Sequence, residues 1–264
     1  MVVNSLASMT RESKLIGVIF FCGLLVVCEL ISRLEVVNPL FIPPVSKVLG
    51  SFMTLVLSGD IPLQILASMK RAAVGYSLAA LVFVPLGILM GRVSWVHRML
   101  EVIVELARPI PPPVVIPVAM LFFGIEDEMK IFVIFFACAW PILLNTIDGA
   151  RSIDPVVINT ARTFGLPAVK TLLQVILPAC SPQIMTGLRV SLPITLILVV
   201  ISEMVGSTDG IGYFILDSQR RFKVDHMYAG MLSLAILGYA LNQLFFLAHR
   251  SLLLWHWGLR GLES

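Results

Sequence analysis

The chain has 264 residues, of which 58% are hydrophobic and only 13% are charged, and its mean hydropathy is +0.96. Soluble domains average about 45–50% apolar and about 25% charged residues, so charge this scarce cannot cover a water-facing surface. The net charge of +3 is small, and the basic residues are scattered along the chain rather than clustered. This pattern does not indicate a nucleic-acid-binding protein. The composition therefore predicts an integral membrane protein.

Six apolar runs meet the requirement of about 20 residues for a membrane-spanning helix, and none alternates as a barrel strand does. Their approximate bounds are Leu15–Ser32, Leu63–Gly91, Met99–Phe123, Met129–Ile147, Pro182–Val205 and Met227–Ala248. No small-residue cleavage site follows the first run, so we expect a retained helix rather than a signal peptide. Lysine and arginine favour the cytoplasmic side, and their loop distribution predicts an inner N-terminus.

We expect three parts along the chain. Residues 1–60 hold the first spanning helix and an extracytoplasmic connecting segment, residues 61–250 a core with five spans, and residues 251–264 a cytoplasmic tail. In the connecting segment, Val37–Gly59 predicts a proline-marked turn and a short amphipathic helix, with a solvated loop as the alternative. Gly206–Lys223 predicts a Gly- and Asp-rich turn followed by a short helix at the membrane surface.

The third span carries the stretch ELARPIPPPVVIPV. Its four closely spaced prolines cannot continue a straight helix, because proline removes a backbone donor and clashes with the preceding turn. Freed backbone groups at membrane depth are tolerated only inside protein or beside a water-filled cavity. We therefore predict a bent helix that places Arg108, Pro109 and Pro111 along a pore. A kink without a transport role is the alternative.

Glu203 is an ionisable residue near the outer end of the fifth span, in an otherwise apolar stretch. Such residues are costly in lipid and mark functional sites by default. Two interpretations stay open, a role in the translocation path or its gate, and a structural hydrogen bond to a neighbouring helix.

Motifs for catalysis and metal binding are missing from the sequence. The four cysteines form no CxxC pair, and the four histidines have no metal-ligand spacing. No GxxxxGK[ST] phosphate loop, HExxH or GxSxG pattern occurs. We therefore predict no catalytic residue, metal or cofactor on this chain.

The segment Ile153–Pro178 is long and half-polar for a connection between two spans. Asp154 followed by Pro155 predicts a helix N-cap with proline at the first helical position. This helix is expected to end at Gly165, which can adopt a left-handed conformation. A second short helix is expected to end at Pro178, before a new cap-plus-proline pair at 181–182 opens the fifth span.

The first of these two helices is predicted to carry Val157, Ala161 and Phe164 on one apolar stripe. A well-capped helix with such a face could dock into a groove on another protein. A purely structural elbow is the alternative from these residues alone.

The stretch NTARTFG followed by VILP resembles the EAA loop of type I ABC importer permeases. In that family the pattern is Glu-Ala-Ala, three residues, Gly, nine residues, then Ile-x-Leu-Pro. Here Asn159, Thr160 and Ala161 fill the first three places, Gly165 is the glycine, and Pro178 closes the motif at the family's spacing. The family's glutamate is thus an asparagine in this chain, so any salt bridge made by that glutamate is absent.

Further blocks extend the resemblance over roughly residues 43–250, towards the sulfonate, taurine and nitrate branch of these permeases. They are FGIEDEMKIF, LLNTIDGARSID, ILPACSPQIMTGLRVSL and SEMVGSTDGIGYFI. The resemblance implies an all-α fold of about six spans with a cytoplasmic coupling helix. It implies contacts to the ATPase from Asn159, Thr160, Ala161, Arg162, Phe164, Gly165, Leu166 and Pro178.

The resemblance also implies the partners of the chain in a bacterial plasma (inner) membrane. These are two ABC ATPase subunits that bind ATP and magnesium, a second permease copy and an extracytoplasmic solute-binding protein. The expected activity is transport of a small solute, an anion such as an alkanesulfonate, taurine or nitrate. A stand-alone secondary transporter or channel is the alternative, although it predicts inverted repeats that are not evident here. A scaffold without transport ranks last.

Overall fold

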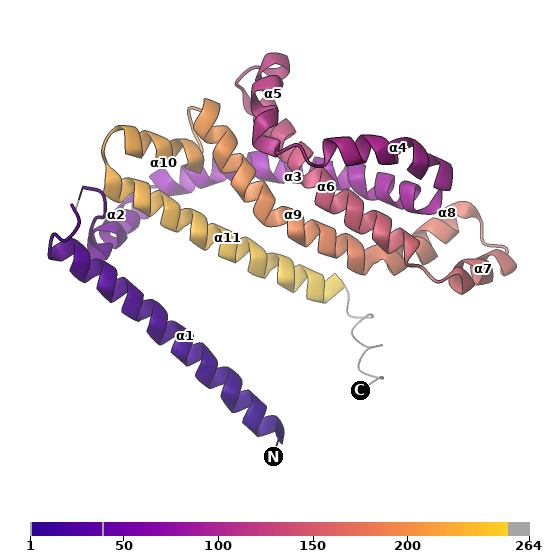
Figure 1. Ribbon diagram of the computed structural model, residues 1–264, viewed down its shortest axis with the longest axis horizontal. Helices are drawn as coiled ribbons and strands as arrows, with labels where there is room; N and C mark the ends of the chain where they lie inside the picture. The colour runs from indigo at the N-terminus through magenta and orange to yellow at the C-terminus, as the bar shows by residue number, and fades with distance from the viewer. Residues whose placement is uncertain (1, 39, 253–264) are drawn as a thin grey trace. The chain divides into compact units, whose positions relative to one another are not determined.

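The computed structural model describes residues 2–38 and 40–252, and every regular element in these ranges is helical (Figure 1). The predicted all-α fold class is confirmed. The α-helices are α1 (Val2–Arg33), α2 (Val45–Leu57), α3 (Asp60–Arg92), α4 (Ser94–Ala107), α5 (Ile116–Phe123), α6 (Asp127–Arg151), α7 (Pro155–Thr163), α8 (Ala168–Thr171), α9 (Leu177–Gly206), α10 (Ile211–Arg220) and α11 (Val224–Leu252). A 3-10 turn, Pro112–Val115, precedes α5, and a π-helix, Leu172–Ile176, precedes α9.

Five of the six predicted spans each lie within one helix of the structure, and the third, Met99–Phe123, is divided by a bend. By length and hydropathy, four helical stretches among the described residues can cross a membrane, namely α3, α6, Ala168–Gly206 and Val224–His249. The α4 helix and Pro112–Phe123 form a fifth candidate as a bent pair. The first predicted span, Leu15–Ser32, lies within α1. Of the predicted tail, 251–264, residues 251 and 252 end α11 and residues 253–264 lie outside the described residues.

The predicted bend in the third span is confirmed. The two halves of the bent pair meet at 90° across the proline-rich stretch. Arg108 caps α4, and the 3-10 turn starts with two prolines at 112 and 113. Because proline donates no backbone hydrogen bond, the α-helical ladder cannot pass through this stretch and the chain changes direction.

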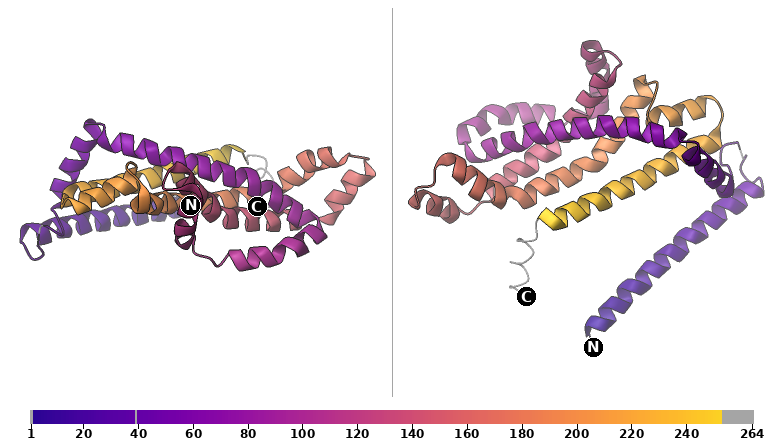
Figure 2. Two further views of the ribbon diagram at one scale, coloured as in Figure 1. Left: turned by 90° about the horizontal axis from the view of Figure 1, so that it is seen from above. Right: turned by 180° about the vertical axis from the view of Figure 1, so that it is seen from behind.

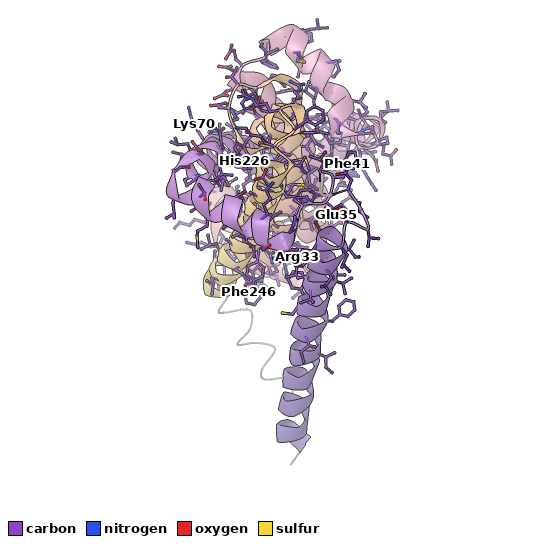
Figure 3. The ribbon with its side chains drawn as sticks, turned by 90° about the vertical axis from the view of Figure 1, so that its left-hand side faces the viewer. Arg33, Glu35, Phe41, Lys70, His226 and Phe246 are labelled. Carbon is purple, nitrogen blue, oxygen red and sulfur yellow. The ribbon has the colours of Figure 1, made fainter. Side chains whose placement is uncertain are left out.

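The chain divides into two compact units, one of Met1–Pro62 with Phe214–Ser233 and the other of Leu63–Tyr213 with the chain from Leu234 onward. In the first unit the predicted amphipathic helix of the connecting segment is α2. The Glu29 carboxylate near the end of α1 accepts hydrogen bonds from the backbone N–H and hydroxyl of Ser46, at 3.0 and 2.8 Å. Figure 3 shows Arg33 at the end of this helix, where it pairs with Glu29 at 2.6 Å.

The second unit is built on close packing of α3, α6 and α9. A Cβ atom added at Gly87 of α3 would lie 2.6 Å from Cβ of Thr146 on α6. One added at Gly187 of α9 would lie 2.8 Å from the backbone oxygen of Pro141 on α6. Small residues let helix backbones approach in this way, and packing then replaces the hydrophobic effect as the stabilising force in lipid.

The predicted second short helix, ending at Pro178, is wrong. Helix is continuous from Ala168 to Gly206, and Pro178 and Pro182 both lie inside it. The π-helix Leu172–Ile176 rearranges the backbone bonds just before Pro178, whose nitrogen has no proton to donate. Pro182 likewise leaves the Pro178 carbonyl without a helix donor, and the Ser181 hydroxyl replaces it at 2.8 Å. Local rearrangement thus accommodates prolines that were expected to end the helix.

Candidate functional site: the coupling loop and the outer polar network

The loop between α6 and α9 forms a hairpin of α7 and α8 at one end of the second unit (Figures 1 and 2). Local chemistry defines both ends of α7. At the start, the Asp154 carboxylate accepts the Val156 backbone N–H at 2.8 Å, as the sequence predicted. At the end, Gly165 has φ +67°, and Leu166 N–H donates to the Ala161 carbonyl at 3.1 Å. With Gly165 N–H bonded to the Arg162 carbonyl at 2.9 Å, these contacts make a Schellman motif.

The α7 helix has one face packed on its own spans and one face open. Ile158 is buried in a cluster that includes Ile88 of α3, Ala150 of α6 and Cys180 of α9. Ala161 is also buried. The three residues of the predicted apolar stripe, Val157, Ala161 and Phe164, nevertheless line one hollow on α7.

The open face of α7 is apolar nonetheless. Phe164 is 80% exposed and Val156 66% exposed. A hollow of about 560 Å³ lies beside them. Its lining residues are Val156, Val157, Thr160, Ala161, Phe164, Leu166 and Val175.

Most of the predicted coupling residues lie together on this hairpin. Asn159, Arg162 and Gly165 are exposed, and Leu166 is half-buried. Within the described residues the side chains of Asn159 and Arg162 make no hydrogen bond or ion pair with their own chain. Pro178 lies apart from this group, in the first turn of α9, where it is half-buried.

Glu203 lies near the other end of α9 in a network of donors. Its side chain is fully buried, and it accepts hydrogen bonds from the Ser68 hydroxyl at 2.8 Å, from Arg71 Nη1 at 2.9 Å and from the Gly212 backbone N–H at 2.9 Å. The hydrogen bond to a neighbouring helix, one of the two interpretations, is therefore present. A buried carboxylate satisfied in this way strongly favours one arrangement of α9 and α3.

Arg71 of α3 is the centre of this network, and its side chain is only 5% exposed. We call it the outer polar network because the fifth span is predicted to have its outer end near Glu203. Besides Glu203, Arg71 pairs with Asp127 at the start of α6, at 2.6 Å, and with Asp209 in the turn before α10. The sequence interpretation missed Arg71. The position of Arg71 could have identified it, because it lies eight residues inside an apolar span. A charged residue at such a position indicates a buried partner.

The turn that follows α9 is held on α3 by further bonds. Gly210, at φ +101°, donates its N–H to the Gln64 side-chain oxygen at 2.7 Å, and Ile211 N–H donates to the Ser68 hydroxyl at 2.9 Å. The hydrogen bond from the Arg71 guanidinium holds the pKa of the Asp209 carboxyl below its ordinary value. This turn is thus fixed by polar bonds to one spanning helix.

The other residues predicted to line the translocation path lie in the bend after α4. Arg108, Pro109 and Pro111 are all exposed. No hydrogen bond or ion pair in the described part of the chain joins Arg108 to Glu203, so the structure does not bring these two predictions into one cluster. Groups of three or more His, Cys, Asp or Glu side chains that could hold a metal ion are not found among the described residues.

The α7–α8 hairpin and the outer polar network lie at opposite ends of α6 and α9. Asp127 begins α6 and Arg151 ends it, while α9 runs from beside the hairpin to Gly206. The 30 residues of α9 correspond to about 45 Å of helix. The helices α6 and α9 therefore connect an exposed apolar surface to a buried ionic cluster.

Comparison with known proteins identifies the family of this chain. Residues 83–253 match the family described as "Binding-protein-dependent transport system inner membrane component". The taurine transport system permease protein of Escherichia coli is 31% identical over 238 residues, covering 88% of this chain and 86% of that protein. A putative aliphatic sulfonates transport permease protein of Bacillus subtilis is 30% identical over 239 residues, covering 90% and 87%.

A solved structure agrees in fold. An inward-facing conformation of the MetNI methionine ABC transporter aligns with a TM-score of 0.59 at 20% identity, covering 70% of this chain and 92% of that chain. The family consists of membrane permease subunits and not of the ATPases of such systems. The chain therefore belongs to the permeases of binding-protein-dependent transport systems, as a multi-pass type I ABC importer permease of the sulfonate and taurine branch.

Proposed function

We propose that two copies of this chain form the translocation path of an ATP-driven importer in a bacterial plasma membrane. Two separate ATPase subunits bind ATP and magnesium, and they also bind the α7–α8 hairpin on the cytoplasmic side. The observation that carries this proposal is the form of α7, which is capped at both ends, anchored inward by Ile158 and open outward at Phe164.

The anchoring of α7 explains how ATPase closure would reach the membrane. A conformational change requires a partner that binds two states differently, and the ATPase pair, open or closed around nucleotide, is such a partner. Force on α7 passes through Ile158 to residues of α3, α6 and α9, because these pack in one buried cluster. At the outer ends of these helices, Arg71 of α3 forms ion pairs with Asp127 of α6 and Glu203 of α9. Displacement of the inner ends therefore tilts the helices.

The solute is proposed to be a small anion, such as an alkanesulfonate, taurine or nitrate, delivered by an extracytoplasmic binding protein. Support comes from the relatives named for taurine and aliphatic sulfonates. The site residues proposed for the ATPase contact are those of the hairpin with Pro178. The exposed bend at Arg108 and the network around Glu203 are proposed to line or gate the path.

The test of coupling uses two glycines in the same backbone region. Gly165 has φ +67° and Gly59 has φ +86°, and an added Cβ meets no atom within 4 Å at either position. Valine at either site therefore meets the same backbone strain and no steric clash. Gly165→Val is expected to reach the membrane but to lose ATPase co-purification and uptake of radiolabelled taurine, whereas Gly59→Val keeps both.

A second pair of variants tests the docking face without backbone strain. Phe164→Ala removes an aromatic ring that is 80% exposed on α7, and Phe20→Ala removes one that is 74% exposed on α1. Only the first is expected to weaken ATPase binding, by the 2 kcal/mol or more (~30-fold) typical of an aromatic anchor. Normal uptake in both Gly165→Val and Phe164→Ala would refute the coupling role. Native mass spectrometry of the purified complex would count the permease copies.

A further inference from the structure

An arginine lies within the apolar length of α9, away from both sites described above. Arg189 is about 18 Å along the helix axis from Leu177 and about 26 Å from Gly206. Its side chain is exposed, and within the described residues it forms no ion pair and no hydrogen bond. A charged side chain inside a spanning helix is costly in lipid, and such residues face a water-filled cavity or a partner.

Arg189 opens onto a hollow of about 540 Å³ between α9 and α11. The α9 side of this hollow follows one helical face, with lining residues at intervals of three and four. Gly238 of α11 contributes no side chain, and a Cβ added there would lie 3.4 Å from Cδ1 of Leu196. The complete lining is Thr186, Arg189, Val190, Leu192, Pro193, Leu196, Gly238 and Asn242.

The lining contains both polar and apolar side chains. Arg189 supplies five N–H donors in a planar fork, and the Asn242 amide supplies two more. The apolar lining residues on α9 include Leu192, Pro193 and Leu196. No carboxylate lines the hollow, so its formal charge is positive. This contrasts with the network around Arg71, where three carboxylates neutralise the arginine.

We propose that this hollow is an anion-binding subsite of the translocation path and that it takes a small organic oxyanion with a short alkyl part. Arg189 and Asn242 hold the charged oxygens, because guanidinium matches planar oxyanion geometry with two parallel hydrogen bonds. Leu192, Pro193 and Leu196 contact the alkyl part. The inference rests on the proposed importer function and adds to it the residues that select for charge.

An anionic oxygen at Arg189 could also belong to a lipid phosphate, which a long side chain at a membrane interface can reach. The two sources differ in water access. A solute path admits water-soluble reagents to Asn242, whereas a lipid-filled hollow excludes them. The test therefore measures access and charge preference directly, without requiring the natural solute.

The first experiment places a cysteine at Asn242 in the intact transporter, with the four native cysteines replaced by alanine. A sulfonate-bearing and a trimethylammonium-bearing methanethiosulfonate are compared by their rates of reaction. We expect the anion-to-cation rate ratio to fall at least fivefold when Arg189→Gln is added, and not when Arg98→Gln is added. Arg98 is a matched control because it is an exposed arginine of α4 outside the hollow. An unchanged ratio, or no reaction with either reagent, overturns the proposal.

The second experiment measures uptake of radiolabelled ethanesulfonate by the full transporter. Arg189→Gln is expected to reduce uptake at low solute concentration at least tenfold, the effect of losing a charge-assisted hydrogen bond. Arg189→Lys should retain more uptake than Arg189→Gln, and Arg98→Gln should match the wild type. ATPase co-purification should be unchanged in all three variants. Wild-type uptake by Arg189→Gln would overturn the subsite, whereas a wild-type chain that binds no ATPase would overturn the importer function instead.

Discussion

Replacement of Arg71 by methionine should destabilise this permease more than removal of any surface ion pair. Arg71 and Glu203 are 5% and 0% exposed and lie 2.9 Å apart. Breaking such a buried pair costs about 3–5 kcal/mol, because the remaining charge is left without a partner. The other two acids, Asp127 and Asp209, are 39% and 51% exposed, so each adds only about 0–1 kcal/mol. We expect a total of about 3–7 kcal/mol.

The assay is reversible unfolding of the purified protein in mixed micelles, with two comparisons. Arg221→Met breaks an exposed pair with Asp217, 62% and 31% exposed, and should cost less than about 1 kcal/mol. The double variant of Arg71→Met with Glu203→Met should be more stable than Arg71→Met alone, because it leaves no buried charge. Equal losses for Arg71→Met and Arg221→Met would refute the importance of the outer polar network. If the stability loss of the double variant equals the sum of the losses of the two single variants, the electrostatic explanation is refuted.

Three further predictions concern single residues. Asp209 has a lowered pKa, so its stabilising effect is fully present above its unfolded pKa of about 3.9 and is lost progressively as the pH falls from there through the lower folded pKa. The stability difference between wild type and Asp209→Asn should therefore shrink continuously as the pH falls below about 4. A difference that does not change with pH in this range would contradict the ion pair. Ile158→Ala should cost about 2–4 kcal/mol and loosen α7, measured as faster hydrogen exchange of its amides, and unchanged exchange would contradict its anchoring role. Gly87→Ala should destabilise by about 1–3 kcal/mol because its methyl group would lie 2.6 Å from Thr146, whereas Gly50→Ala, with open space around it, should not.

Patterns that act over a few residues were predictable from the sequence. The caps of α7 depend on Asp154 and Gly165, whose preferences are set by their own backbone and by neighbours two to five residues away. The 90° bend follows from proline chemistry, and the length of each span follows from bilayer thickness. The spacing of the family's EAA-loop motif also located the hairpin, because the hairpin is formed by one continuous segment of the chain.

Features that join distant residues were not predictable in this way. Pro178 carries a strong local stop signal, yet the π-helix and the Ser181 hydroxyl keep α9 continuous while it packs against α6. Which face of α7 turns inward was decided by the cluster around Ile158, which packs this residue against α3, α6 and α9.

The sequence by itself determined that this chain is a bundle of spanning helices with a capped, exposed hairpin, because hydropathy, proline and helix caps act locally. Only the tertiary structure decided that Arg71 meets Glu203, 132 residues away, and that Arg189 and Asn242 line one hollow. The physical reason is that charge pairing and cavity shape depend on the approach of separate helices. That approach is set by the packing of small residues along α3, α6 and α9, which no single segment encodes.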